Sequence, residues 1–232
     1  MTSEASLLVA ETFGPTLQGE GPSCGRQAVF IRLSRCNLRC SFCDTPYTWD
    51  WSRYDPRAEA RTMTVSALTA WALGLSPRLV VITGGEPLLQ QAGLIPLVTE
   101  LIAADRRVEI ETNGTVVPDP GLVRKGVQFN VSPKLRNAGM PHDRRLVQDA
   151  LIAFAASGQA VFKFVAENHD DLDEIAEAER RYGLSPVWVM PEGARADVVL
   201  DRALKLADEV VAHGWHLTLR LQVLLWEAAR GH

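Results

Sequence analysis

Short apolar segments rich in β-branched residues alternate with longer segments of helical periodicity, and this alternation constrains the fold more than any other feature of the sequence. The expected strands are 7–12, 28–33, 79–83, 108–111, 128–131, 160–165, 186–189 and 216–222. The expected helices are 65–73, 88–104, 143–157, 170–182 and 195–213. Strands joined by such helices form a mostly parallel sheet with right-handed crossovers. Because about eight strands are matched by only about five helices, the sequence predicts an α/β fold with an incomplete TIM-like barrel.

Length and composition predict one domain that spans residues 1–232. The chain carries 24 Lys and Arg against 28 Asp and Glu, a net charge of −4, so its charge does not suggest a nucleic-acid partner. The longest apolar runs fall far short of the roughly 20 residues that a membrane helix requires. Residues 1–9 contain Glu4 and no Lys or Arg, unlike the start of a secretory signal. We therefore expect a cytoplasmic protein with no membrane partner.

Polar or glycine-rich sequence directly follows several of the expected strands. These segments are 34–43, 84–87, 112–115 and 132–134. In barrels of parallel strands the active site lies at the carboxyl ends of the strands. The convergence of these segments at one end predicts a catalytic mouth there.

The four cysteines of the chain are confined to residues 24–43. In a cytoplasmic chain, clustered cysteines bind metal or perform redox chemistry more often than they form a disulfide framework. Cys36, Cys40 and Cys43 provide too few thiolates for a structural zinc site, and they suit a four-iron cluster in which one iron has no protein ligand. The alternative is an all-cysteine zinc site that includes Cys24.

The spacing Cys36-x3-Cys40-x2-Cys43, with Phe42 before the last cysteine, resembles the signature of radical S-adenosylmethionine (SAM) enzymes. Residues 84–87, Gly-Gly-Glu-Pro, are similar to the glycine-rich motif of that superfamily, where glycine lets the backbone approach the SAM amino group. The resemblance implies a partial barrel of the radical SAM type. The cofactors that it implies are a [4Fe–4S] cluster and SAM.

Further motifs resemble 7-carboxy-7-deazaguanine synthases within that superfamily. They are residues 16–21 (Thr-Leu-Gln-Gly-Glu-Gly), Arg32, 43–45 (Cys-Asp-Thr), 111–115 (Glu-Thr-Asn-Gly-Thr) and 132–134 (Ser-Pro-Lys). This resemblance covers about residues 11–134. It implies a lyase that converts 6-carboxy-5,6,7,8-tetrahydropterin into 7-carboxy-7-deazaguanine with loss of ammonia, on the route to queuosine and other deazapurines. It also implies Mg²⁺, an electron donor such as flavodoxin or ferredoxin, and a homodimer.

The same resemblance implies roles for individual residues. The iron–sulfur ligands are Cys36, Cys40 and Cys43, and the Mg²⁺ ligand is Thr45. The substrate contacts are Leu17, Gln18, Gly19, Arg32 and Thr83. The SAM contacts are Phe42, Asp44, Gly85, Glu86, Ser132, Pro133 and Lys134. Further candidates are Glu20, Asn113 and Gln222.

Some of these residues also have plainer interpretations. A Thr that follows Asp44 is typical of a helix cap, and Arg32 is typical of a solvent-facing edge residue unless its face of the strand lines the barrel interior. Lys163 alternates with Phe162 and Phe164 in the apolar strand 160–165, so it either lines the interior or, as we expect, extends to the surface. Gln222 stands in the expected last strand, where the family often has histidine.

Two other functions fit part of the sequence. A radical SAM activase of a glycyl-radical enzyme would share the cysteine spacing, but it would not account for residues 17–19, Arg32 and Thr45. A non-enzymatic zinc-binding module would use all four cysteines.

Overall fold

The structure is a computed structural model that describes residues 4–227 and 229–231. The strands are β1 (Ser6–Leu17), β2 (Gln27–Leu33), β3 (Arg61–Thr64), β4 (Leu79–Gly84), β5 (Arg107–Thr112), β6 (Val127–Val131), β7 (Ala160–Ala166), β8 (Val187–Pro191) and β9 (His216–Leu217). The helices are α1 (Pro56–Glu59), α2 (Val65–Leu73), α3 (Gln91–Ala103), α4 (His142–Arg145), α5 (Gln148–Ser157), α6 (His169–Tyr182), α7 (Ala196–Ala212) and α8 (Leu221–Trp226). Short 3-10 turns occupy Gly21–Ser23, Pro46–Thr48, Pro87–Gln90 and Arg136–Ala138.

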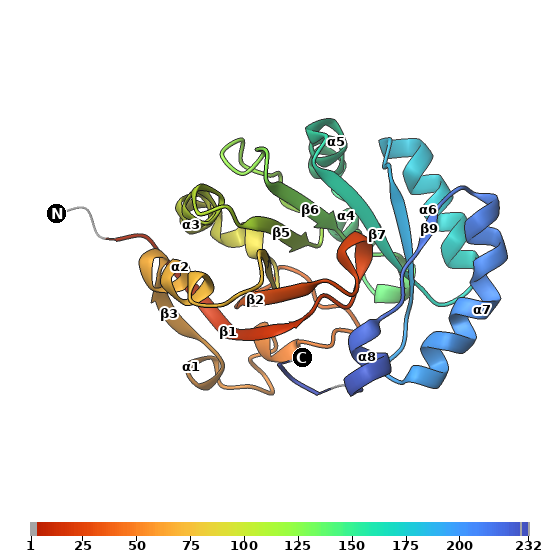
Figure 1. Cartoon of the computed structure of the whole chain (residues 1–232). Coiled ribbons are helices and arrows are strands. Elements are labelled where there is room, and N and C mark those ends of the chain that lie inside the picture. Colours follow the sequence, from red (N-terminus) through yellow and green to blue (C-terminus); the bar gives the residue numbers. More distant parts are fainter. Residues whose placement is uncertain (1–3, 228, 232) are drawn as a thin grey trace.

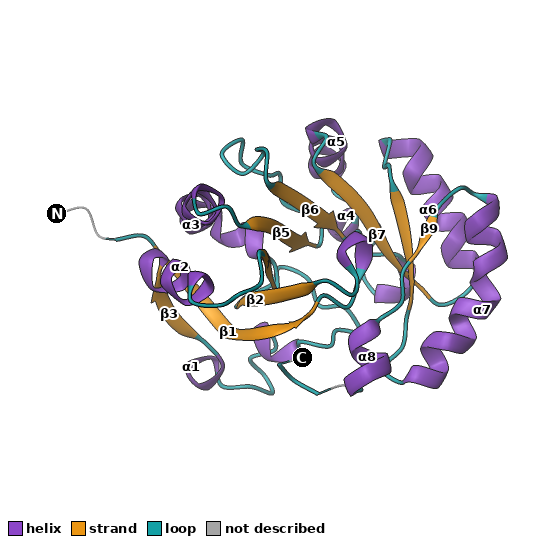
Figure 2. Cartoon of the chain, in the orientation of Figure 1, coloured by secondary structure: helices purple, strands orange, loops and turns teal. Residues whose placement is uncertain are grey.

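The strands of the described residues form one sheet in the order β3-β1-β2-β4-β5-β6-β7-β8-β9. β1 pairs antiparallel with β2 and β3, whereas the pairings from β2 through to β9 are parallel. The sheet curves as an open arc from β3 to β9 (Figure 1), and α2, α3, α5, α6 and α7 lie along its outer side (Figure 2). The predicted incomplete barrel is therefore confirmed. No helix in the described part of the chain is long and apolar enough to cross a membrane.

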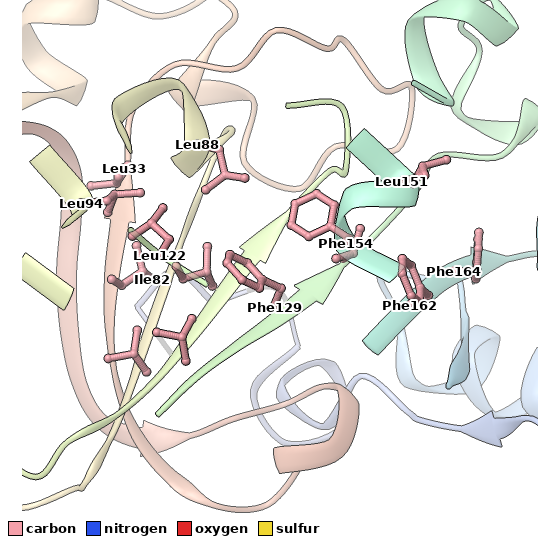
Figure 3. Packing of buried hydrophobic residues seen from close by; sticks show 14 of the residues in the cluster. Leu33, Ile82, Leu88, Leu94, Leu122, Phe129, Leu151, Phe154, Phe162 and Phe164 are labelled. Carbon is pink, nitrogen blue, oxygen red and sulfur yellow. The ribbon is translucent and has the colours of Figure 1, made fainter. Parts of the chain in front are cut away.

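The outer face of the sheet carries the main hydrophobic core. Alternate strand residues such as Ile31, Ile82 and Phe129 are fully buried against the helices. Phe129 of β6 packs edge-on against Phe154 of α5, with the ring centroids 5.2 Å apart (Figure 3). Strands that are covered on both faces read as continuous apolar runs, which explains why β4 is apolar from Leu79 to Ile82.

The inner face of the same strands is mixed in polarity. Phe30 and Val81 belong to a small apolar cluster on this face. Because side chains alternate along a strand, Arg32 and Thr83, which are register partners, continue the inner face toward the carboxyl ends of β2 and β4. The same alternation places Lys163 of β7 on the inner face, between Phe162 and Phe164 of the outer core. The inner face therefore supplies polar groups to the space that the sheet encloses.

The structure differs from the sequence predictions in several elements. The expected strand 216–222 ends at Leu217 as β9, and Gln222 lies on helix α8, because the Leu221 amide donates to the Gly19 carbonyl at 2.9 Å. The expected helix 143–157 divides into α4 and α5, because Leu146 and Val147 leave helical geometry. The expected helix 88–104 begins as a 3-10 turn, in which the Glu86 side chain accepts from the Leu88 amide at 3.0 Å. β3 and α1 were not predicted.

Candidate functional site

A cavity of about 340 Å³ occupies the inner side of the sheet and its carboxyl end. It is lined by nearly all of the residues to which the sequence assigns a role. They are Leu17, Gln18, Gly19, Glu20, Arg32, Cys36, Cys40, Phe42, Cys43, Asp44, Thr45, Thr83, Gly85, Asn113, Ser132, Lys134 and Gln222. Glu86 and Pro133 do not line it. The fold thus brings residues from positions 17 to 222 to one space.

The cysteine loop, residues 34–48, follows β2 and is held by backbone contacts. The Arg35 amide donates to the Thr48 carbonyl at 2.7 Å, and the Arg35 carbonyl accepts from the Glu86 amide at 2.8 Å. A Cβ atom on Gly85 would lie 2.1 Å from the Arg35 carbonyl oxygen, so only glycine allows this approach. The glycine motif therefore fixes the loop, in addition to lining the cavity.

The three loop cysteines are free thiols whose surroundings suit the thiolate ligands of an iron–sulfur cluster. Cys36 Sγ accepts from the Leu38 amide at 3.4 Å and lies 3.9 Å from Asn113 Nδ2, and Cys43 Sγ accepts from Trp49 Nε1 at 3.2 Å. Hydrogen bonds to sulfur are one means by which proteins tune such clusters. Burial is the main cause that raises the pKa of Cys36 to about 12 and also raises the pKa of Cys40. The residues present fit a [4Fe–4S] cluster.

Cys24 takes no part in this loop. Its side chain is exposed, and its thiol donates to the Gly19 carbonyl at 3.3 Å. In the described part of the chain, no group of three or more His, Cys, Asp or Glu side chains converges closely enough to hold a single metal ion. The ligands of a four-iron cluster bind different irons and stand farther apart than those of one ion. The zinc site built from all four cysteines is therefore wrong.

Glu86 braces the strand ends behind the cavity. Its carboxylate is fully buried and accepts from Thr112 Oγ1 and from the Asn113 amide, each at 2.7 Å. Burial raises its pKa. Asn113 Nδ2 in turn donates to Asn37 Oδ1 at 2.9 Å, which ties the end of β5 to the cysteine loop. Glu86 thus acts on the site by positioning Thr112 and Asn113.

Glu111 belongs to the 111–115 motif but was given no role of its own, and in the structure its carboxylate accepts from two of the predicted substrate residues. Gln18 Nε2 donates to its Oε1 at 3.1 Å, and Thr83 Oγ1 donates to its Oε2 at 2.7 Å. All three side chains line the cavity. They form a rim of hydrogen-bonding groups beside the connection between β1 and β2.

Lys163 and Glu20 form an ion pair within the cavity wall, with 7% and 15% of their side chains exposed. The prediction that Lys163 extends to the surface is wrong, because its inner position in β7 points it at Glu20. Glu20 also accepts from Gln222 Nε2 at 2.7 Å and lies 3.4 Å from Arg220 Nε. Burial opposes the ionisation of Glu20, but the charges of Lys163 and Arg220 outweigh it and lower its pKa to about 2.

Arg32 faces the cavity from β2, so the solvent-facing alternative is wrong. Its Nε donates to Glu11 Oε1 at 2.6 Å, and its guanidinium lies 5.6 Å from the centre of the Phe13 ring. Burial opposes ionisation of Glu11, but Arg32 and a 2.7 Å hydrogen bond from the Tyr47 hydroxyl hold its pKa below the usual value. Within the described residues, neither terminal nitrogen of Arg32 has a hydrogen-bond partner. Those nitrogens are free to bind an anion.

Thr45 precedes the 3-10 turn Pro46–Thr48 but makes no side-chain capping hydrogen bond. The helix-cap interpretation is therefore wrong. Its hydroxyl lines the cavity and lies 3.7 Å from Cys43 Sγ. The neighbouring Asp44 forms an ion pair with Arg220. A hard oxygen donor is thus available beside the cysteines.

The described part of the C-terminal segment, residues 220–227 and 229–231, lies along the cavity. Arg220 donates to the Gly193 carbonyl at 2.8 Å as well as pairing with Asp44. Arg230 Nε donates to Glu11 Oε2 at 3.0 Å, and its guanidinium lies 3.8 Å from the centre of the Tyr47 ring. Gln222 packs closely on Gly19, because a Cβ on Gly19 would lie 1.8 Å from Gln222 Oε1 and would displace that side chain. The segment therefore contacts both the cysteine loop and β1.

Glu227 follows α8 with φ 56° and ψ −133°, a region that essentially only glycine adopts. Replacing Glu227 by glycine is expected to stabilise the native state by about 1 kcal/mol, because the relief of strain exceeds the entropy gained by the unfolded chain. The melting temperature of the metal-free protein should rise by about 2–4 °C. Glu227→Ala removes the same carboxylate but keeps a Cβ, so it should give no rise. Equal melting temperatures for the two variants would contradict the strain.

No role was predicted for Glu11, Glu111 or Arg220, although Glu111 stands in the 111–115 motif, and Lys163 was expected at the surface. A signal for Glu111 and Lys163 was present, since each is a charged residue at an alternate position of a strand that is otherwise apolar. No comparable signal marks Glu11 or Arg220, because their roles depend on the antiparallel pairing of β1 and on the path of the C-terminal segment.

Comparison with known proteins agrees with this geometry. Residues 30–125 match the Radical SAM superfamily. A 7-carboxy-7-deazaguanine synthase of Pyrobaculum aerophilum is 39% identical over 236 residues, which cover 100% of both chains. The synthase of Methanospirillum hungatei is 46% identical over 215 residues, which cover 90% of this chain and 85% of the relative.

Solved structures give the same result. The crystal structure of QueE from Escherichia coli matches with a TM-score of 0.72 and 26% identity, over 93% of this chain and 94% of that chain. SuiB of Streptococcus suis, bound to its precursor peptide, matches with a TM-score of 0.59 over 82% of this chain and 47% of that chain. At 13% identity, the likeness to SuiB concerns the fold alone.

An open parallel barrel with a three-cysteine loop at its carboxyl end defines the class: this is a radical SAM protein. Within that class the chain belongs to the 7-carboxy-7-deazaguanine synthase family, since relatives of that name match it along its whole length. This membership decides against the zinc-binding module and the glycyl-radical activase.

Proposed function

We propose that the chain is a radical SAM lyase that converts 6-carboxy-5,6,7,8-tetrahydropterin into 7-carboxy-7-deazaguanine and releases ammonia. The observation that carries this proposal is the single cavity shared by the cysteine loop, Arg32 and the Gln18–Glu111 rim. Such a cavity can hold SAM against the cysteines and a carboxylated, guanidine-containing ring further inside. All 232 residues would serve as one domain around it.

The side chains of the inner wall match the groups of a carboxypterin. The terminal nitrogens of Arg32 can bind the 6-carboxylate in a bidentate way. Carboxylate oxygens of Glu111 and Glu20 can accept from the N–H groups of the guanidine-like edge, and the Gln18 amide can both donate and accept. Leu17, Gly19 and Thr83 complete the wall. These residues bind and orient the ring and exclude water from it.

Cys36, Cys40 and Cys43 would hold the [4Fe–4S] cluster, and Phe42, Asp44, Gly85, Asn113, Ser132 and Lys134 would surround SAM. When bound, the cluster and SAM supply the one-electron chemistry that starts the reaction. Lys134 Nζ donates to Ser132 Oγ at 2.9 Å, so these two side chains present adjacent donors to a carboxylate or a ribose. Thr45 offers its hydroxyl to Mg²⁺, which usually keeps waters and adds substrate oxygens rather than a full protein cage.

The reaction needs a reductant, and we propose an electron-transfer protein such as flavodoxin or ferredoxin in that role. We also propose a homodimer and a place on the route to queuosine. The supporting observation is that relatives named 7-carboxy-7-deazaguanine synthase match the whole chain.

The decisive experiment is anaerobic turnover of 6-carboxytetrahydropterin by the cluster-loaded chain with SAM, dithionite and Mg²⁺. We expect 7-carboxy-7-deazaguanine to form together with ammonia. If the cluster is complete and SAM is cleaved but no deazaguanine appears, the substrate assignment is wrong.

Replacing Arg32 by methionine is expected to weaken binding of 6-carboxytetrahydropterin about 100-fold, because a charge-assisted bidentate contact worth roughly 2–3 kcal/mol is lost. Equilibrium titration of the anaerobic protein measures this effect. Tetrahydropterin without the carboxylate is the control ligand, and its affinity should change little. If both ligands weaken equally, Arg32 acts on the shape of the cavity and does not bind the carboxylate.

A further inference from the structure

We propose that an acidic one-electron carrier protein docks on a basic surface that covers the outer side of the cysteine loop. Arg39, Arg136 and Arg144 define this basic surface. The inference rests on the proposed function, since a chain without a redox cluster would not need such a partner. It adds the place of docking and the residues that attract the carrier.

Contacts between the cysteine loop and residues 136–144 bring the three arginines together. The Ser41 amide donates to the Ala138 carbonyl at 3.1 Å, and Ser41 Oγ donates to the Asn137 carbonyl at 3.0 Å. Arg144 Nη2 lies 3.4 Å from the Asn37 carbonyl. The segment that carries Arg136 and Arg144 thus packs directly on the residues between the cysteines, where Arg39 also lies.

The local charge is opposite to that of the whole molecule. Residues 35–41 and 136–144 contain Arg35, Arg39, Arg136 and Arg144 but a single acid, Asp143, whereas the chain has a net charge of −4. Arg39 and Arg144 are exposed and form no ion pair with any described residue. Arg136 lies 3.8 Å from Glu174, a carboxylate that Arg145 already engages at 2.6 Å. Arg39 and Arg144 can therefore pair with a partner's carboxylates, and Arg136 shares its one carboxylate with Arg145 and keeps an exposed side chain.

Two other sides of the cysteines are taken up in the proposed complex. On the inner side, the cysteines face the cavity that SAM and the substrate would fill. At the cavity rim, the C-terminal segment joins the cysteine loop through Arg220 and Asp44, and joins β1 through Arg230 and Glu11. Electron transfer falls steeply with distance, so a carrier has to dock close to the cysteines, and the basic surface packs directly on the residues between them. Weak, transient redox interfaces are small and rely on complementary charge for rapid encounter.

The test uses the cluster-loaded chain and its Arg136→Glu/Arg144→Glu double variant, with a reduced acidic flavodoxin as the probe. Stopped-flow absorbance follows reduction of the cluster, and calorimetry measures flavodoxin binding at low ionic strength. We expect the double variant to lower both the affinity and the second-order rate about tenfold or more. Added salt should weaken binding of the unmodified chain more than that of the variant.

Two controls make the outcome specific. Lys125→Glu reverses a charge at the opposite end of the sheet, before β6, and should leave flavodoxin binding unchanged. Reduction by dithionite, which needs no docking, should be equal in all variants. Unchanged flavodoxin binding in the double variant, or equal slowing with dithionite, would overturn the proposal. Failure of the pterin assignment would appear only in turnover with dithionite and would leave the cluster-reduction comparison intact.

Discussion

Replacing Cys40 by alanine is expected to reduce the bound iron from about four atoms per chain to nearly none and to abolish SAM cleavage and turnover. Three thiolates hold three of the four irons, and the fourth iron has no protein ligand. Loss of one of these thiolates leaves two irons without a protein ligand, so the cluster is no longer held. The fold should persist, because the loop cysteines are not part of the main hydrophobic core. Iron and sulfide quantification after anaerobic reconstitution, with circular dichroism of the same samples, measures both effects.

Cys24→Ala is the matched control for this prediction. The Cys24 thiol is exposed and donates only to the Gly19 carbonyl, so its removal should leave iron content and turnover close to those of the unmodified chain. Full iron in Cys40→Ala, or comparable loss of iron in Cys24→Ala, would contradict the three-cysteine assignment.

The barrel could be predicted because local patterns determine it. β2 and β4 show β-branched runs, and α6 shows an amphipathic helix bounded by the Asn168 cap and Gly183. β3 was not predicted, for the opposite reason. Residues 61–64 have no apolar alternation and become a strand only by pairing with residues 6–9 of β1. Their structure is decided by a distant segment.

The C-terminal region shows the same limit more clearly. Residues 216–222 have the composition of a strand, yet the chain turns at Thr218 and enters α8. The Thr218 amide donates to the Val189 carbonyl at 2.9 Å, and Leu221 bonds to Gly19, a residue about two hundred positions earlier. The secondary-structure preference of a short segment carries no information about such distant contacts. Gln222 nevertheless lines the cavity, although the strand predicted for it is helix α8 in the structure.

Cavity residues could be predicted where they belong to a sequence motif. They could not be predicted where their position depends on a contact with a distant residue. The cysteines, Gly85 and Arg32 stand in recognisable patterns at strand ends. Lys163 stands inside a strand, where the choice between surface and interior depends on which neighbouring strands close over it. β6 and β8 flank β7, and Glu20 reaches it from the connection after β1. Only the assembled sheet shows that this lysine has a buried carboxylate as its partner.

Lys163→Met is therefore expected to destabilise the metal-free protein by about 2–3 kcal/mol. Removing one member of a buried ion pair costs roughly 3–5 kcal/mol, and the remaining contacts of Glu20 with Arg220 and Gln222 reduce that value. For a chain of 232 residues the melting temperature should fall by about 5–10 °C. The value of kcat/KM should fall about 100-fold, because Glu20 loses the contact that positions it against the substrate.

A double-mutant cycle with Glu20→Gln separates stability from function. Lys163→Met/Glu20→Gln leaves no unpaired charge and should recover most of the lost stability, but not turnover, since the Glu20 carboxylate is then absent. The pH dependence follows from the lowered pKa of Glu20, about 2 against an ordinary value of 4.5. The pair stabilises the native state above about pH 4.5, and that contribution disappears as the pH falls toward 2, so the stability difference between the unmodified chain and Glu20→Gln should shrink over this interval. A Lys163→Met variant with an unchanged melting temperature would instead place this lysine at the surface, as its sequence context alone predicts.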